Sequence, residues 1–241
     1  MTENLFISDL HLSGERPATV ALALRFLDQV ASRADRLYIL GDLFDAWIGD
    51  DDTAPPIPEI TAALARLNER GTRVFLMHGN RDFLLGDAFC RTTGCTLLPD
   101  PSVIQLEGEP VLLMHGDLLC IDDRDYQEAR RKLRSPETVT YILSRSLAER
   151  AVMAADMRRR SGEATSRLPG DIMDVNETAV REQMLQHRVR LLIHGHTHRP
   201  AIHTFELEGK SARRIVLAEW TEQGGSYLQV VNGEPKLIPY S

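Results

Sequence analysis

Five short aliphatic runs, each ending in Asp, His or Asn, constrain the fold of this chain most. They are LFISDLH from Leu5, LYILGD from Leu37, VFLMHGNRD from Val74, VLLMHGD from Val111 and LLIHGHTH from Leu191. Runs of this length are typical of strands that are buried on both faces. Helical patterns beginning at Pro17 and Ile57 separate the first three runs, which predicts β-α-β units. In such folds the polar residues at the carboxyl ends of the strands converge.

The middle of the chain has a different pattern. Residues 125–160 show helical periodicity, with a break at Pro136 and an apolar stripe from Val139 to Leu147. We therefore expect a helical cap inserted at about residues 124–175. The later segments RRIVLAEW, SYLQVV and PKLIPY predict mainly antiparallel strands. A length of 241 residues suits one α/β domain over residues 1–241 that carries this cap.

Composition excludes several classes of protein. The net charge of −7 argues against nucleic acid as a partner. Between Arg124 and Arg167, however, eleven Lys and Arg stand against six Asp and Glu, so this segment is either a solvated helical face or a binding surface. No apolar run has the length of a membrane-spanning helix, and no secretory signal precedes the first strand, so a cytosolic protein is expected.

Cysteine usage gives no sign of a disulfide framework or a zinc knuckle. The three cysteines, Cys90, Cys95 and Cys120, are odd in number and lack CxxC spacing. We expect reduced, packed thiols.

The ends of the five runs together supply a set of metal-ligand side chains. One histidine at a strand end is more often structural than a ligand, but seven such residues at five strand ends indicate a metal centre. Carboxylate, imidazole and amide ligands suit Mn, Fe, Co or Zn, and their number exceeds the need of one ion. The seven residues are Asp9, His11, Asp42, Asn80, His115, His196 and His198.

The order of the motifs SDLH, LGDLF, HGNRD, MHGD and HGHTH resembles the calcineurin-like metallophosphoesterase family. This resemblance implies a two-sheet β sandwich flanked by helices. It also implies two metal sites: one ion bound by Asp9, His11 and His198, the other by Asn80, His115 and His196, with Asp42 bridging them. A strand period of two would point His196 and His198 to the same side. His194 and His78 are expected to support or pack.

The residue after Asn80 indicates the bond that is broken. Two ions can lower the pKa of a bridging water and hold a phosphoryl group, which predicts phosphoester or phosphoanhydride hydrolysis. Relatives that expel an alkoxide often carry GNHE, whereas this chain has GNRD with Arg81. Arginine grips phosphate oxygens but is no acid at neutral pH, so Arg81 favours a pyrophosphate, whose leaving group needs no proton. Asp82 either orients Arg81 for this role or forms a purely structural pair with it.

Longer motifs, including LYILGDLFDAWIGDD, MHGDLLCIDDRDYQ, IMDVN and LIHGHTHRPA, resemble the lipid A branch of this family from end to end. That resemblance implies manganese-dependent hydrolysis of UDP-2,3-diacylglucosamine by water attack on the α-phosphorus, giving UMP and 2,3-diacylglucosamine 1-phosphate. It implies Asn80, Arg81 and His115 as catalytic residues. The implied substrate contacts are Asn80, Arg81, Asp123, Tyr126, Ser161, Thr165, Arg167 and His196.

Three of these contacts have open alternatives. Taken alone, Asp123 could equally mark the N-terminus of a helix, and Tyr126 could equally be a packing aromatic, with neither of them in contact with substrate. Leu168 stands where relatives often have a basic residue, so Arg167 either replaces that contact or the contact is lost.

The resemblance gives the basic segment a function. The cap would hold the acyl chains and contact an anionic bilayer, which implies a peripheral protein on the cytoplasmic face of the inner membrane. Two alternatives remain: a soluble phosphodiesterase or dinucleotide polyphosphate hydrolase, and a non-catalytic protein-binding scaffold. The complete ligand set argues against the scaffold.

Overall fold

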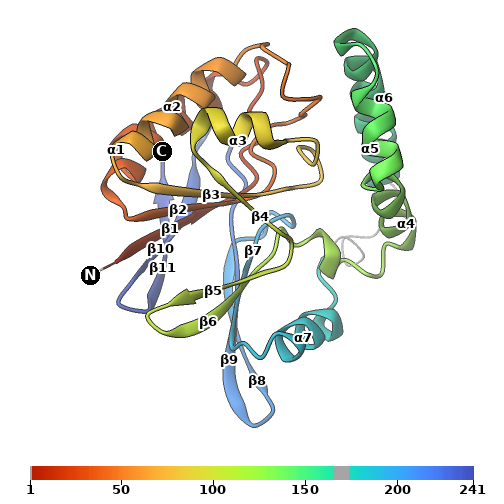
Figure 1. Cartoon of the computed structure of the whole chain (residues 1–241). Helices are drawn as coiled ribbons and strands as arrows, with labels where there is room; N and C mark the ends of the chain where they lie inside the picture. The colour runs from red at the N-terminus through yellow and green to blue at the C-terminus, as the bar shows by residue number, and fades with distance from the viewer. Residues whose placement is uncertain (1, 166–173) are drawn as a thin grey trace.

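A computed structural model describes residues 2–165 and 174–241, with two sheets packed face to face between layers of helices (Figure 1). The first sheet has the order β11-β10-β1-β2-β3-β4. Its strands are β1 (Glu3–Ile7), β2 (Arg36–Leu40), β3 (Arg73–Met77), β4 (Thr96–Leu98), β10 (Gly225–Val231) and β11 (Glu234–Tyr240). Strands β1 to β4 are parallel, and the hairpin β10–β11 adds to β1 in antiparallel direction. The predicted β-α-β units and the α/β two-sheet class are confirmed.

The second sheet has the order β5-β6-β7-β9-β8. Its strands are β5 (Ser102–Leu106), β6 (Glu109–Leu113), β7 (Leu191–His194), β8 (Ala201–Leu207) and β9 (Lys210–Val216). The C-terminal strands are less uniform than predicted: β8–β9 and β10–β11 are antiparallel hairpins in different sheets, and β9 pairs with β7 in parallel. The edge strands β5 and β8 escaped prediction because many of their side chains are exposed, which leaves no continuous apolar run.

After its first one or two residues, each of β1, β2 and β3 is apolar because both of its faces are buried. Leu5 and Ile7 of β1 face the helical layer formed by α1 (Pro17–Gln29), α2 (Ile57–Glu69) and α3 (Asp87–Thr93). The residue between them, Phe6, faces the second sheet. Its ring stacks on Tyr38, with the ring centroids 4.7 Å apart, and Tyr38 stacks on Phe75 at 4.8 Å. This alternation matches the period of two of a strand.

The outer face of the second sheet is covered by α7 (Glu177–Gln186). Its buried side chains Val180 and Met184 pack with Leu112 of β6 and Leu192 of β7. Two 3₁₀ turns, η1 (Ala31–Arg33) and η2 (Asp117–Leu119), complete the body of the protein. The five strand ends are thus fixed between two helical layers.

Three consecutive helices stand beside the sandwich: α4 (Arg124–Leu133), α5 (Pro136–Leu143) and α6 (Leu147–Thr165) (Figure 1). Pro136 begins α5, where Ser135 caps the helix. The side chain of Arg150 in α6 ties this segment to the body, since it donates to the Ile48 carbonyl and to both carboxylate oxygens of Asp51. No helix in the described part of the chain is long and apolar enough to cross a membrane.

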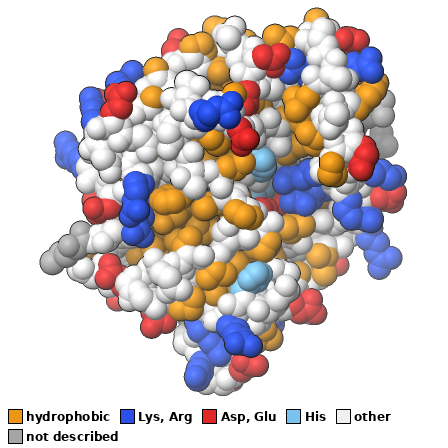
Figure 2. All heavy atoms as spheres, viewed as in Figure 1, with side chains coloured by type: hydrophobic (Ala, Val, Ile, Leu, Met, Phe, Trp, Pro, Cys, Tyr) orange, Lys and Arg blue, Asp and Glu red, His pale blue; other side chains and the backbone are white. Residues whose placement is uncertain are grey.

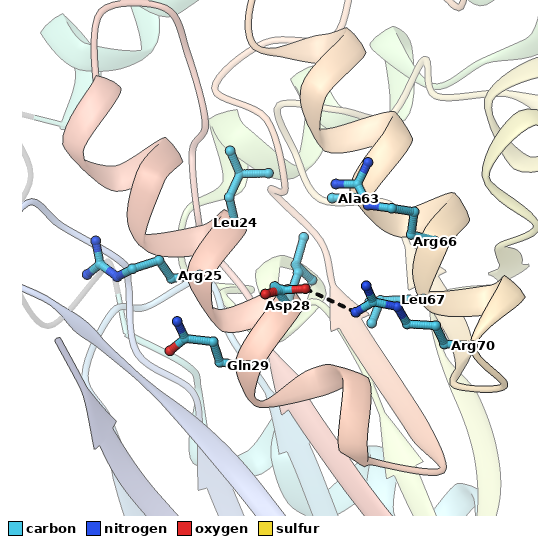
Figure 3. Close-up of a pocket in the computed structure, with 9 residues that line it drawn as sticks. Leu24, Arg25, Asp28, Gln29, Ala63, Arg66, Leu67 and Arg70 are labelled. Atoms are coloured by element: carbon cyan, nitrogen blue, oxygen red, sulfur yellow. Dashed lines mark hydrogen bonds and ion pairs between the residues drawn. The ribbon is translucent and has the colours of Figure 1, made fainter.

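A groove of about 320 Å³ lies between α1 and α2 (Figure 3). Arg70 and Asp28 form an ion pair of 3.0 Å across it. Its residues come from the second halves of the two helices, which lead to the starts of β2 and β3. The groove therefore lies at the opposite end of the first sheet from the polar strand ends.

Candidate metal centre

The polar residues after β1, β2, β3, β6 and β7 meet at one place, where the two sheets approach each other. Backbone hydrogen bonds hold these strand ends in register: Asp9 donates to the Gly41 carbonyl, and His11 donates to the Asp42 carbonyl. The backbone N–H of His196 donates to the Asp9 carboxylate at 2.9 Å, which joins the second sheet to the first. The convergence predicted from the sequence is confirmed.

The first group of ligand atoms surrounds Asp9. The Nε2 atoms of His11 and His198 are 3.3 Å apart, and His198 Nε2 is 3.4 Å from Asp9 Oδ1. The Nδ1 atom of His11 lies 3.8 Å from Asp42 Oδ2. Asp9, His11 and His198 form one of two clusters with metal-ligand geometry among the described residues.

The second group surrounds Asn80. Its amide oxygen lies 3.1 Å from His115 Nε2 and 3.1 Å from His196 Nδ1. His115 Nε2 is also 3.9 Å from Asp42 Oδ2. Asp9, Asp42 and His115 form the second cluster with metal-ligand geometry. Asp42 therefore contacts both groups, as a bridging ligand would.

The loops after the strands have unusual backbone conformations. Asp9, His11, Asp42, His196 and His198 all have positive φ, between 48° and 68°. The left-handed region costs a residue with a Cβ about 1–2 kcal/mol, and such strain gathers at functional sites.

The predicted strand period through HGHTH is wrong. Strand β7 ends at His194, and tight left-handed turns, not a pleat, point His196 to one group and His198 to the other.

Two glycines allow the loops to approach each other. A Cβ at Gly79 would lie 2.1 Å from Asp42 Oδ1, and one at Gly195 would lie 2.3 Å from Asp9 Oδ2. Any side chain at either position would displace a carboxylate of the centre. Packing therefore requires glycine directly before Asn80 and directly before His196.

The charges of the centre suit divalent cations. Burial raises the pKa of Asp42 to about 7, with Asp82 and Asp9 adding to the effect. Burial lowers the pKa of His196 to about 4, so this ring is neutral and offers a lone pair. Burial also opposes charge on His198, yet the neighbouring carboxylates of Asp9 and Glu219, at 3.4 and 3.2 Å, raise its pKa to about 10. The proton on His198 partly neutralises the negative charge of the nearby carboxylates. A metal ion that displaced this proton would supply the positive charge instead.

Buried atoms without partners provide a further test of this fit. Within the described residues, Asp9 Oδ1 and His11 Nδ1 are buried and make no hydrogen bond. Buried polar atoms are normally satisfied, and an ion is one explanation when they are not. The Nε2 atom of His115 faces the centre. Its other ring nitrogen, Nδ1, lies 2.9 Å from the Leu40 carbonyl, and this contact orients the ring. The donor set fits a metal centre.

Arg81 lies at the edge of this centre, but it is held differently from the prediction. Its backbone N–H donates to Asp42 at 2.8 Å, and its guanidinium pairs with Asp45 at 2.9 Å. Asp82 does not orient it. The buried Asp82 carboxylate accepts backbone hydrogen bonds from Gly79 and Leu43 and fixes those two loops. Asp45, which the motif analysis missed, also pairs with Arg158 of α6 at 2.5 Å.

Asp117 is a second functional candidate that sequence reasoning missed. It is fully buried behind the metal centre, and its Oδ2 accepts from Arg130 Nε at 2.6 Å and from the Tyr126 hydroxyl at 2.8 Å. Arg134 approaches the same oxygen at 3.6 Å and donates to the Gly79 carbonyl at 2.7 Å. Burial alone would raise the pKa of Asp117, but the surrounding positive groups, His115 first, hold it below its ordinary range. This carboxylate ties α4 to the loop after β6, which carries His115, and Arg134 in turn contacts the loop that carries Asn80.

The predicted substrate contacts have mixed positions. Tyr126 lies with its ring centroid 6.0 Å from that of His196, beside the centre. Asp123 caps α4, where its side chain accepts from the Tyr126 backbone N–H at 3.0 Å. Ser161 and Thr165 fall in α6, but their side chains lie outside the described residues, as do Arg167 and Leu168.

The two supporting histidines differ in position. His194 is fully buried, with Nδ1 2.9 Å from the Gly195 carbonyl and Nε2 3.3 Å from the guanidinium of Arg214. His78 Nε2 lies 2.7 Å from the Leu85 carbonyl. Neither ring belongs to the two ligand groups. Glu219, which the motifs do not contain, lies 3.2 Å from His198 Nδ1 and orients that ring.

A sandwich with this cluster between its sheets defines a class of metal-dependent phosphoesterases. The calcineurin-like phosphoesterase family matches residues 5–200, and the chain belongs to this family. Among its relatives, the UDP-2,3-diacylglucosamine hydrolase of Pseudomonas paraeruginosa (strain DSM 24068 / PA7) is 54% identical over 95% of both chains. The protein of the same name from Azotobacter vinelandii (strain DJ / ATCC BAA-1303) is 51% identical over 98% of both.

A solved structure supports the fold alone. The cold-active protein-tyrosine phosphatase of a psychrophilic Shewanella species is 12% identical, with a TM-score of 0.50 over 100% of this chain and 81% of that one.

Proposed function

We propose that this protein hydrolyses the pyrophosphate bond of UDP-2,3-diacylglucosamine, giving UMP and 2,3-diacylglucosamine 1-phosphate. Similarity over nearly the whole length to hydrolases of that name supports the substrate. The observation that carries the chemistry is the position of Arg81, a half-exposed guanidinium tethered by Asp45 at the rim of the metal centre.

We propose two divalent ions, both manganese, at the centre. One ion would be held by Asp9, His11 and His198, and the other by Asn80, His115 and His196. Asp42 would contact both ions. When bound, such a pair lowers the pKa of a water molecule and neutralises charge on the phosphoryl oxygens. The separation of the ligands into two groups around Asp9 and Asn80 supports this division.

Arg81 and Asn80 would bind the pyrophosphate. The Arg81 guanidinium lies 4.0 Å from Asp42 Oδ2, so a phosphoryl group over the metal centre is within its reach. Arginine supplies two parallel N–H donors to phosphate oxygens and stays charged at all working pH values. Attack on the α-phosphorus releases a sugar phosphate, which leaves as an anion without a proton donor. The chain therefore needs charge stabilisation at this position, which Arg81 provides.

The helices α4 to α6 would act as the cap, at residues 124–175. Arg134 contacts the Gly79 carbonyl beside Asn80, and Tyr126 stands near His196, so α4 already borders the centre. Figure 2 shows Lys and Arg gathered around α4, with hydrophobic side chains along the neighbouring helices. We propose that the apolar side chains hold the acyl chains. The cap residues proposed to contact the substrate are Asp123, Tyr126, Ser161, Thr165 and Arg167.

We propose peripheral contact of the cap with an anionic inner-membrane surface on its cytoplasmic face. Tyr141 and Val152 are 53% and 70% exposed on α5 and α6, beside the basic α4. Each Lys or Arg near such a surface contributes about 1 kcal/mol. The full chain should float with vesicles that contain phosphatidylglycerol and not with neutral ones at low salt. Equal recovery with both kinds of vesicle, or with neither, would refute this contact.

The function is tested by incubation of the purified protein with UDP-2,3-diacylglucosamine, with the product masses measured. We expect UMP and the diacylated sugar phosphate, loss of turnover after treatment with a chelator, and recovery with Mn²⁺. Equal turnover of cyclic nucleotides or of UDP-sugars without acyl chains would instead favour a soluble phosphodiesterase or a polyphosphate hydrolase.

A further inference from the structure

A second pocket, of about 280 Å³, lies on the side of the metal loop that faces β8 and β9. Its walls come from the loop between β7 and β8, from β8 and β9 and from Asp174, which lies three residues before α7. The residues that matter are Asp174, Thr197, Arg199, Ala201, His203 and Arg214. None of them belongs to the two ligand groups.

Arg214 gives the pocket a charge without a balancing ion pair. Its side chain is partly buried, and its NH1 atom lies 3.3 Å from His194 Nε2. Among the described residues no carboxylate comes within ion-pair distance of it. A half-buried cation in this state favours a ligand with an oxygen acceptor.

Thr197 connects this pocket to the metal centre. It stands between His196 and His198 in the chain and contributes to the pocket wall. Its hydroxyl oxygen is buried and has no hydrogen-bond partner within the described residues. A hydroxyl can both donate and accept, so this atom is an unsatisfied polar group in the same pocket as the Arg214 cation.

The size and the polarity of the pocket select the part of the substrate that it can take. Pockets for whole ligands measure about 300–1,000 Å³, so this one suits a ring system and not two acyl chains. A pyrimidine edge presents carbonyl oxygens to Arg214 and to the Thr197 hydroxyl. Ribose hydroxyls can donate to Asp174, whose carboxylate now pairs with Arg199 at 2.7 Å.

We infer that this pocket binds the uridine part of the substrate, an inference that rests on the proposed function. The pyrophosphate then lies across the metal centre, with the lipid part directed to α4–α6 and the nucleoside to β8 and β9. Thr197 and Arg214 become specificity residues for the nucleotide.

Filling the pocket tests the inference. Ala201→Phe places a ring in the pocket from β8, while Ile202→Phe adds the same bulk at the next residue, which is 43% exposed and does not line the pocket. Inhibition is measured against bis(4-nitrophenyl) phosphate hydrolysis, so the lipid substrate is not needed. We expect Ala201→Phe to weaken inhibition by UMP at least about tenfold relative to inhibition by methyl phosphate, which has no nucleoside. Ile202→Phe should leave this ratio within about twofold.

An unchanged ratio for Ala201→Phe would overturn the inference. Should that variant fail to fold, Arg214→Gln is measured in the same way, and an unchanged ratio there has the same meaning. If UMP binding depends on the pocket but UDP-2,3-diacylglucosamine is not cleaved by the unaltered protein, the proposed function fails while the nucleotide pocket stands.

Discussion

Asn80→Ala is expected to lower kcat/KM for UDP-2,3-diacylglucosamine by about 10²- to 10³-fold. The amide oxygen faces both His115 and His196 at 3.1 Å, so its removal opens one metal site and removes a contact to the phosphoryl group. Loss of one preorganised group that stabilises transition-state charge has an effect of about this size. The metal content should fall from two ions per chain towards one, as measured by elemental analysis.

The matched control is Asn68→Ala, because the amide of Asn68 donates to the Thr93 carbonyl in the helical layer, away from the strand ends. That variant should keep the original rate. Thermal unfolding of Asn80→Ala should stay close to that of the unaltered protein, since the change lies in a loop after β3. Near-normal turnover of Asn80→Ala with both ions retained would contradict the two-metal assignment.

Asp117→Ala is expected to lower the free energy of unfolding by about 3–5 kcal/mol. The side chains of Arg130 and Arg134 are only 14% and 19% exposed, and both lose their shared carboxylate. Arg130 keeps the more distant Asp100, at 3.6 Å, and Arg134 keeps the Gly79 carbonyl, while the Tyr126 hydroxyl loses its acceptor. Mostly buried cations that lose their nearest carboxylate are costly. In a protein of this length the change corresponds to a fall in Tm of about 10 °C by calorimetry.

Glu128→Ala is the control for Asp117→Ala. Glu128 also lies on the α4 side of the protein and pairs with Lys132, but both side chains are more than half exposed. Exposed pairs contribute little, so the Tm should hardly move. A loss of less than about 1 kcal/mol for Asp117→Ala would show that Tyr126, Arg130 and Arg134 do not depend on this carboxylate.

The sequence predicted the β-α-β units and the convergence of the seven polar residues at the strand ends because both depend on local patterns, whereas the two-sheet sandwich was implied by the family resemblance. Leu37 to Leu40 is apolar at every position, since neighbouring side chains are buried in different cores. Asp42 follows that strand directly, so its place at the sheet edge requires no knowledge of the tertiary structure.

The supporting residues required the tertiary structure. Asp45 reaches Arg81 across 36 residues, and Glu219 reaches His198 from the chain after β9. The adjacent Asp82 looked like the partner of Arg81, but the turn around Gly79 points its carboxylate inward to the backbone. The path of the HGHTH loop was mispredicted for the same reason. The Asp9 carboxylate occupies the place that a Cβ at Gly195 would take, directly before the left-handed turns at His196 and His198, and the one-dimensional pattern does not contain this contact.

The central claim is that water attacks the α-phosphorus of a UDP-linked lipid at this metal centre. The most direct test is hydrolysis of UDP-2,3-diacylglucosamine by the Mn²⁺-loaded protein in ¹⁸O-labelled water, with both products weighed by mass spectrometry. We predict that the label enters UMP and is absent from 2,3-diacylglucosamine 1-phosphate. Label in the lipid phosphate would place the attack on the other phosphorus and contradict the claim.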